Sequence, residues 1–361
     1  MKCLCGECKQ EGDKDDMTLF DSILLCHKCF TYLVTECYEC GELFWVTQTR
    51  HSGDYQVCID CFSDSYVDCI RCGDGVRCED AVEIDCDSYC ESCAAEEDNQ
   101  YLRSYDYKPY PIFYGSGTYY GIELEVDEGG EDSEIAEHLY KKYNHSDELF
   151  YIKRDGSLLN GLEIVSHPMT LDYHINNMIW RNLLSDLKFF GYKSHDTKTC
   201  GYHIHVNRSS FGKTLDEQDE KIANIIYFVD KYWDYIKTFS RRSSFSIDQW
   251  ASRYLVMDDR DHALKYVKEG SKERYVCINL QAHYTIEFRI FKGTLKYETF
   301  IACLQFVDVL CTTVANMCSY SLIDFTWYDL FSNLDQTKNE LTDFLKHKKL
   351  LNSPSMDRGE S

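Results

Sequence analysis

At 361 residues the chain is long enough for more than one domain. Its formal net charge is −23, and residues 1–100 hold 7 Lys/Arg against 23 Asp/Glu, a balance of −16. So acidic a region would repel a phosphate backbone, which disfavours nucleic acid and favours a basic protein partner. The simpler interpretation is that this acidity only keeps the region in solution.

The first predicted elements are three zinc modules, at about 1–32, 33–64 and 65–93. In each, two Cys-x2-Cys pairs are separated by 17 residues, and each module starts 32 residues after the last. A tetrahedral four-thiolate zinc site needs two such turns, and zinc would supply most of the folding free energy of units this small. The predicted ligands are Cys5, Cys8, Cys26, Cys29, Cys37, Cys40, Cys58, Cys61, Cys69, Cys72, Cys90 and Cys93.

A disulfide framework is the alternative. Two points argue against it. A disulfide framework would not need paired Cys-x2-Cys turns in strict register, and we expect no secretory signal after Met1, whereas disulfide-rich domains are typically secreted. Three cysteines lie outside the register, Cys3, Cys78 and Cys86, of which Cys3 could replace Cys5 and Cys86 could compete with Cys90. The spacing resembles that of LIM-type and other treble-clef zinc modules.

The next predicted segment, 94–117, reads as a Tyr- and Pro-containing linker, followed by a domain at 118–350 and a disordered tail at 351–361. The remaining five cysteines lie in mostly apolar contexts typical of reduced core residues, which favours a cytoplasmic location. The most apolar stretch, Ile301 to Ile323, contains Gln305, Asp308 and Asn316 at helical spacing, so we predict a buried helix and no membrane span.

The domain at 118–350 is predicted to be α+β, an antiparallel sheet with helices packed on one face. Strand patterns fall at 118–127, 148–153, 162–167, 201–207, 274–280 and 284–292, the last two forming a hairpin. Helical periodicity falls at 133–143, 172–190, 216–239, 298–318 and 336–349.

Four of these strands present polar side chains at period two, which places them on one face of the sheet. They are Glu123 and Glu125, Glu163, His203 and His205, and Glu287 and Arg289. An ordinary half-exposed sheet explains any one strand. It explains the set poorly, because crowded carboxylates repel one another unless a divalent cation neutralises them. Oxygen-rich sites favour Mg²⁺ or Mn²⁺, and Arg289 is suited to a phosphate.

Five motifs follow one another along this domain. They are Gly121-Ile-Glu-Leu-Glu125, Lys153-Arg-Asp-Gly-Ser-Leu158, Gly161-Leu-Glu-Ile-Val-Ser-His-Pro168, Cys200-Gly-Tyr-His-Ile-His-Val-Asn207 and Glu287-Phe-Arg-Ile-Phe-Lys-Gly-Thr294. In this order they make the chain resemble the amidoligase family of carboxylate-amine ligases, which has a glutamine-synthetase-like catalytic fold. The resemblance implies that ATP phosphorylates a carboxylate substrate to an acyl phosphate, and that an amine, free or borne on a protein, then displaces phosphate.

The resemblance also assigns roles. Glu123, Glu125, Glu163, His203 and Glu287 would be metal ligands, with His205 a further metal or phosphate contact. Arg289 would stabilise the transferring phosphoryl group, with Lys153 and Lys292 as further phosphate contacts, and Asp155 would orient the amine or remove its proton.

Three alternatives remain at this stage. One is a thiolate nucleophile made by Cys200 with His203. The second is a phosphotransferase of the guanidino-kinase type, and the third is a non-catalytic zinc adaptor that recruits a protein partner.

Overall fold

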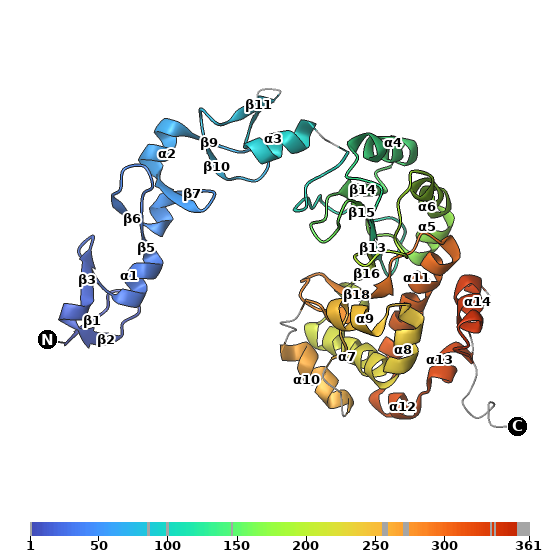
Figure 1. Cartoon of the computed structure of the whole chain (residues 1–361). Helices are drawn as coiled ribbons and strands as arrows, with labels where there is room; N and C mark the ends of the chain where they lie inside the picture. Colours follow the sequence, from blue (N-terminus) through green and yellow to red (C-terminus); the bar gives the residue numbers. More distant parts are fainter. Residues whose placement is uncertain are drawn as a thin grey trace, which may run out of the picture. The chain divides into compact units, whose positions relative to one another are not determined.

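The computed structural model describes residues 2–84, 87–98, 101–145, 147–254, 259–269, 274–332, 334–335 and 337–351. The chain divides into two units, Met1–Gln100 and Tyr101–Ser361 (Figure 1). The predicted tail lies outside the described residues except for Leu351, and Cys86 lies outside them as well.

The first unit repeats one element order three times: two short antiparallel hairpins followed by a helix. The elements are β1 (Lys2–Leu4), β2 (Glu11–Asp13), β3 (Met17–Phe20), β4 (Ile23–Cys26) and α1 (His27–Leu33); β5 (Val34–Glu36), β6 (Leu43–Trp45), β7 (Thr49–Ser52), β8 (Tyr55–Cys58) and α2 (Ile59–Ser65); and β9 (Tyr66–Asp68), β10 (Gly75–Arg77), β11 (Val82–Ile84), β12 (Asp87–Tyr89) and α3 (Glu91–Asp98). Modules therefore change at 33/34 and 65/66, within a residue of the predicted boundaries, while α3 runs beyond residue 93.

Side chains join successive modules. The Trp45 ring packs edge-on against Phe20 with ring centres 5.1 Å apart, and its indole N–H donates to the Asp21 carboxylate at 3.1 Å. Arg50 pairs with Asp68 at 2.7 Å, and the Glu39 carboxylate accepts hydrogen bonds from Tyr66 and Arg77. Because each contact crosses a module boundary, the three modules stack on one another.

The second unit is built on a six-stranded antiparallel sheet in the order β14-β15-β13-β16-β18-β17. Its strands are β13 (Tyr120–Val126), β14 (Phe150–Lys153), β15 (Leu162–Ser166), β16 (Gly201–Asn207), β17 (Ile278–Asn279) and β18 (Thr285–Lys292). All six predicted strands are confirmed, as is the hairpin of β17 and β18. On β13, Ile122, Leu124 and Val126 are fully buried in the core, so the alternate residues face the other side.

The helices of the second unit mostly cover the apolar face of the sheet (Figure 1). They are α4 (Ser133–Tyr143), α5 (Leu171–Asn176), α6 (Trp180–Phe189), α7 (Leu215–Lys231), α8 (Trp233–Ser240), α9 (Ser244–Trp250), α10 (Arg260–Glu269), α11 (Tyr297–Thr312), α12 (Ser319–Asp324), α13 (Trp327–Ser332) and α14 (Asn339–His347). Phe300 of α11 stacks on Tyr202 of β16, and Phe239 of α8 packs against Phe291 of β18. The α+β prediction is confirmed at this level.

Two long predicted helices are each broken. The pattern at 172–190 is split into α5 and α6, and the pattern at 216–239 into α7 and α8 around Tyr232, whose backbone is non-helical. The Tyr232 hydroxyl donates to the Phe325 carbonyl at 2.9 Å, so a tertiary contact fixes this break. Periodicity did not predict the short helices α9, α10, α12 and α13.

The predicted linker at 94–117 is wrong for its second part. Leu102 is fully buried in the core, and the Arg103 N–H donates to the Ile152 carbonyl at 2.9 Å. The Tyr114 N–H donates to the Pro168 carbonyl at 3.0 Å, so residues 101–117 pack along the sheet. Among the described residues, Tyr297–Asn316 is apolar and long enough to cross a membrane, but 83% of that window is buried, as in a core helix.

Candidate functional site

Strand register brings the predicted polar residues together. Glu123 lies opposite His203, and Glu125 lies opposite Glu163. His205 lies opposite Glu287 on the next strand, and Lys153 opposite Glu163 on the other side. Directly opposed residues in a sheet have Cβ atoms about 5 Å apart, so five adjacent strands assemble one charged surface.

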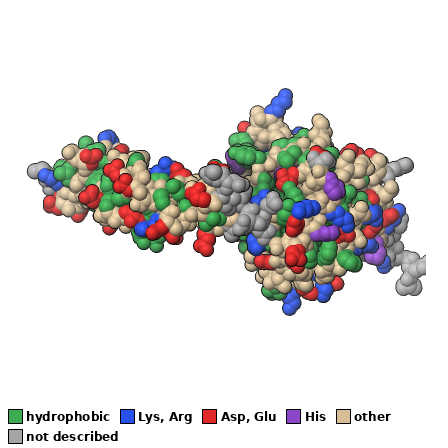
Figure 2. Space-filling model, turned by 90° about the horizontal axis from the view of Figure 1, so that it is seen from above, with side chains coloured by type: hydrophobic (Ala, Val, Ile, Leu, Met, Phe, Trp, Pro, Cys, Tyr) green, Lys and Arg blue, Asp and Glu red, His purple; other side chains and the backbone are tan. Residues whose placement is uncertain are grey.

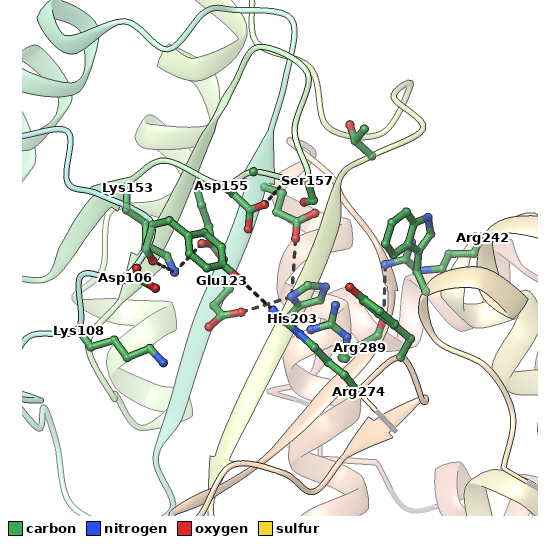
Figure 3. Close-up of a pocket in the computed structure, with 17 residues that line it drawn as sticks. Asp106, Lys108, Glu123, Lys153, Asp155, Ser157, His203, Arg242, Arg274 and Arg289 are labelled. Carbon is green, nitrogen blue, oxygen red and sulfur yellow. Dashed lines mark hydrogen bonds and ion pairs between the residues drawn. The ribbon is translucent and has the colours of Figure 1, made fainter. Parts of the chain in front are cut away.

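This surface forms the floor of a cleft of about 450 Å³ (Figure 3). Its lining residues are Tyr105, Asp106, Lys108, Glu123, Glu125, Lys153, Asp155, Gly156, Ser157, Glu163, Thr199, His203, Arg242, Trp250, Arg274, Tyr275 and Arg289. The cleft therefore combines carboxylates with five cationic side chains and three large aromatic rings.

Two groups of side chains in and beside the cleft have metal-ligand geometry. Glu123, His203 and Glu287 form one group, and Glu125, Asp155 and Glu163 form the other, with one ligand atom from each residue within 4.8 Å of the rest of its group. His203 Nδ1 lies 3.3 Å from Glu123, 3.5 Å from Glu287 and 3.9 Å from Glu125, so it sits where the groups meet.

The donor set fits hard divalent cations. Five carboxylates and one imidazole are the ligands of Mg²⁺ or Mn²⁺ sites, and all five carboxylates gathered here repel one another. When bound, such cations would neutralise this charge and that of a nucleotide triphosphate. The predicted metal ligands Glu123, Glu125, Glu163, His203 and Glu287 all belong to these two groups, which Asp155 joins.

Burial raises the pKa values of two of the carboxylates, whereas neighbouring histidines lower that of a third. Burial, with the charge of Glu123, raises the pKa of Glu163 to about 8, against the opposing effect of Lys153 at 2.9 Å. Burial also raises the pKa of Glu125. For Glu123, burial is outweighed by His205 and His203, which hold its pKa well below the usual value. Protons and cations therefore compete most strongly around Glu163 and Glu125.

The guanidinium groups of Arg289 and Arg242 lie in the cleft beside the two metal-ligand groups. Arg289 pairs with Glu287, and its guanidinium lies 5.7 Å from the centre of the Tyr275 ring. Arg242 is 9% exposed and donates to the Ser246 hydroxyl and the Arg289 carbonyl at 3.3 and 3.4 Å. Burial lowers the pKa of Arg242 to about 10, so it remains a cation at neutral pH. Such buried cations next to open space are suited to phosphate or carboxylate oxygens.

Two of the predicted phosphate or metal contacts lie apart from this cleft. His205 contacts the Glu123 carboxylate at 3.2 Å from the side that faces away from the cleft, where it lines a second, smaller cavity. Lys292, at the end of β18, is not among the described residues that line the cleft, and its carbonyl accepts from Arg241.

The Cys200 thiol does not have the properties of a nucleophile. It is buried, and burial raises its pKa to about 12. Its sulfur contacts the Thr199 hydroxyl and the Lys193 carbonyl, each at 3.8 Å. A thiolate forms with difficulty in such a place, which argues against the alternative of Cys200 acting with His203.

Arg242, Arg274, Trp250 and Tyr275 were missed by the sequence analysis. Arg242 follows α8, Trp250 ends α9, and the other two precede β17. None lies on an alternating strand face. The only signal was the pair Arg241-Arg242 directly after an amphipathic pattern, and such pairs are common on exposed surfaces.

In the first unit, the predicted cysteines form three tetrads with all sulfurs of a tetrad within 4.8 Å. Each is contributed by the turn of one hairpin and the start of a helix. Backbone N–H groups lower the pKa of Cys5 to about 6, and they do the same for Cys37 and Cys69 against the effect of burial. Other thiols of the tetrads have raised pKa values, since burial raises that of Cys29 to about 12 and that of Cys72 to about 11. Four cysteine sulfurs gathered this closely fit zinc, which binds them as thiolates. Cys3 and Cys78 lie outside the tetrads, so Cys5 keeps its assignment.

The sequence profile of a family described as "putative amidoligase enzyme" matches residues 123–311, more than half of the chain. The chain belongs to this amidoligase family. The match runs from Glu123 on β13 to Cys311 on α11 and therefore contains every residue predicted for the polar face of the amidoligase unit.

Among solved structures, the amidoligase chain is similar to the crystal structure of a bifunctional glutathione synthetase from Pasteurella multocida. The two share 13% sequence identity with a TM-score of 0.37, over 66% of this chain and 47% of that chain. The amidoligase thus aligns with about half the length of that protein. The search among curated proteins gives no match.

Proposed function

We propose that the second unit is an ATP-dependent carboxylate-amine ligase that requires Mg²⁺ or Mn²⁺. The observation that supports this function is the pair of metal-ligand groups that meet at His203, bordered by the buried cations Arg242 and Arg289. Metals held there would bridge the carboxylates to the phosphates of ATP.

The proposed reaction has two steps. A carboxylate oxygen of the acid substrate attacks the γ-phosphorus, and the bond from phosphorus to the ADP oxygen breaks. The amine nitrogen then attacks the carbonyl carbon of the acyl phosphate, and the carbon–oxygen bond breaks with its electron pair going to phosphate. Of the two protons that the ammonium group loses, one stays on the released phosphate and the other passes to water.

The chain supplies position and charge for both steps. Arg289 and Arg242 hold the oxygens on which negative charge increases as the phosphoryl group transfers. Asp155 contributes a carboxylate beside Glu125 and Glu163. The Ser157 N–H donates to this carboxylate at 2.6 Å, which fixes the turn that contains Asp155. Trp250 and Tyr275, with ring centres 5.5 Å apart, offer apolar surface for the nucleotide base.

The test is trapping with hydroxylamine, which intercepts an acyl phosphate as a hydroxamate. We expect wild-type protein to form hydroxamate and ADP with one acid from a panel of small carboxylic acids, dependent on ATP and Mg²⁺. Glu125→Gln should slow this at least ~100-fold and weaken binding of Mg-ATP, because it removes a metal ligand. Its melting temperature should be unchanged or higher, since a buried carboxylate next to Glu163 is replaced by a neutral amide.

Other outcomes would contradict the proposal in distinct ways. A phosphorylated product without hydroxamate would indicate a phosphotransferase. Absence of ATP binding would indicate a non-catalytic adaptor. If Glu125→Gln lost stability while binding nucleotide normally, Glu125 would be structural.

We further propose that the zinc modules recruit a basic protein partner. Residues 1–100 have a balance of −16, and each four-thiolate zinc site adds about −2 because four thiolates outweigh one divalent cation. Figure 2 shows Asp and Glu side chains along the face of the first unit. A tethered partner would be present near the amidoligase unit at an effective concentration of roughly millimolar.

A further inference from the structure

The polar face of the sheet contains a second cavity besides the charged cleft. It has a volume of about 180 Å³ and lies toward the start of β13. Glu123 lines both cavities, so the second one ends at a metal-ligand group of the first. The two cavities therefore share the Glu123 side chain as part of their walls.

Apolar groups form most of its wall. Pro109, Pro111 and Pro168 line it together with Val165, and they contribute no side-chain hydrogen-bonding groups. The same wall contains the Glu123 carboxylate, which contacts His205 at 3.2 Å. A methylene chain that ends in a cation fits this order of surfaces, since the stem would contact the prolines and the cation the carboxylate.

His167 presents a polar atom in this wall. It is 2% exposed, and its Nδ1 accepts a hydrogen bond from the Ile112 N–H at 3.3 Å, so its proton lies on Nε2. Among the described residues Nε2 has no hydrogen-bond partner. His167 lines this cavity together with Gly121 and Glu123, which lie two residues or ~6.6 Å apart along β13.

The segments that line the cavity also have aromatic rings exposed to solvent. Tyr110, between Pro109 and Pro111, is 96% exposed, and Tyr284, next to Thr285, is 80% exposed. Exposed tyrosines beside a cavity are typical contact residues for a protein partner.

We propose that the small cavity is the port through which a lysine side chain of a protein substrate reaches the ligase site, which makes the amine of the proposed reaction a lysine ε-amino group. This inference rests on the proposed function. The four-carbon stem lies between the prolines, the ammonium group meets Glu123, and a backbone carbonyl of the substrate accepts from His167 Nε2. Tyr110 and Tyr284 contact the flanking residues of the substrate.

The test measures binding to the full chain in the presence of Mg²⁺ and a non-hydrolysable ATP analogue. The probe is Nα-acetyl-lysine-N-methylamide, and its matched control is the norleucine analogue, which lacks the ammonium group. We expect the norleucine analogue to bind at least tenfold more weakly. Equal binding of the two, or tighter binding of methylamine than of the lysine probe, would overturn the proposal. This comparison uses wild-type protein alone and therefore does not depend on the folding of a variant.

Gly121→Val gives a second readout. A Cβ at Gly121 would meet only the Cβ of His205, at an ordinary 3.6 Å, so the added side chain enters the cavity without a backbone clash. We expect Gly121→Val to weaken lysine-probe binding at least tenfold. The control is Tyr320→Val, at an exposed residue of α12 that lines neither cavity, and it should leave probe binding unchanged. Equal binding by Gly121→Val and wild type would contradict the port.

The two proposals can fail separately. Hydroxamate formation without any preference for the lysine probe would refute the port and leave the ligase standing. Lysine-probe binding that responds to Gly121→Val, without hydroxamate formation, would refute the ligase reaction and leave a lysine-binding cavity.

Discussion

A buried charge is stable only where a partner compensates for the hydration that it loses. Within the amidoligase unit, Glu287 is held by Arg289 and by the Asn279 amide, which donates at 2.8 Å. Glu163 is held by Lys153 at 2.9 Å, and Glu125 accepts the Gly201 N–H. Each carboxylate keeps at least one partner from the scaffold, so the side chains are positioned before any cation binds.

A buried histidine outside the site has a similar dependence on its partners. His174 is fully buried, and its Nδ1 accepts from the Trp180 indole N–H at 3.2 Å. Its Nε2 therefore bears the proton and donates to the Tyr120 carbonyl at 2.9 Å. Burial lowers the pKa of His174 to about 4, so the folded protein holds this ring neutral.

Because His174 is buried in its neutral form, we expect the folded protein to lose stability in acid. The unfolded state takes up a proton near pH ~6.5 and the folded state only near pH 4, so the unfolding free energy falls as the pH drops through this window. The full difference is about 3 kcal/mol. We expect His174→Gln to remove most of this pH dependence between pH 6.5 and 4, measured by denaturant titration of the full chain.

The comparison uses slopes, because the substitution also changes the two hydrogen bonds and therefore the absolute stability. His262→Gln, at an exposed histidine, is the control and should keep the wild-type slope. A wild-type slope in His174→Gln would show that other groups cause the acid sensitivity.

The alternation of polar and apolar residues predicted which side chains of a strand share one face of the sheet. It did not predict which strands are neighbours, and therefore which side chains pair across them. Within each strand the polar residues recur at every second position, which shows that they share a face of the sheet. This applies to Glu123 and Glu125 on β13, to His203 and His205 on β16, and to Glu287 on β18. The order of strands, β14-β15-β13-β16-β18, is set by long-range packing that no local pattern contains. His205 lies apart from the cleft for another reason, because it is two residues further along β16 than His203 and pairs with Gly121 instead of Glu123.

A register shift in the sheet was also beyond the sequence. The pairing of β16 with β18 changes between Tyr202 and Ile204, at His203 and opposite the segment that contains Arg289. Such irregularities redirect side chains and are common beside active sites. Arg242 lies in a loop, and Arg274 falls within the predicted strand 274–280 but lies before β17, which is shorter than predicted, so both reach the cleft only through tertiary folding.

Gly201, the first residue of β16, gives the prediction at this scale. A Cβ at Gly201 would lie 2.5 Å from His203 Nε2 and 3.0 Å from an Arg242 terminal nitrogen. We expect Gly201→Ala to displace both side chains and to lower the unfolding free energy by ~1–3 kcal/mol, the usual range for overpacking. Binding of Mg-ATP, measured by calorimetry, should weaken at least tenfold.

The control is Gly156→Ala, where the added methyl group meets no atom within 4 Å, and its unfolding free energy should match that of wild type. Wild-type affinity for Mg-ATP in Gly201→Ala would mean that His203 and Arg242 do not position the nucleotide.

At the scale of the whole molecule, the two units are stabilised by different means. The second unit has one extensive apolar core, whereas the clusters of the first unit are small and include cysteines. A module with so little apolar burial depends on its metal, which contributes on the order of 10 kcal/mol per structural zinc. The sequence predicted this difference because the cysteine register alone specifies the tetrads.

The last prediction follows from that difference. We expect the wild-type chain to contain about three zinc ions, and the double change of Cys37 and Cys40 to serine to remove the middle one. The neighbouring modules should also become protease-sensitive, because the Trp45–Asp21 and Glu39–Arg77 contacts span their boundaries. The thermal transition of the second unit should stay in place, since its core contains no tetrad. Zinc analysis checks the metal content, limited proteolysis checks the folding of the modules, and calorimetry checks the thermal transition of the second unit. Cooperative loss of the second unit would show that the units fold together, and unchanged zinc content would overturn the modular assignment.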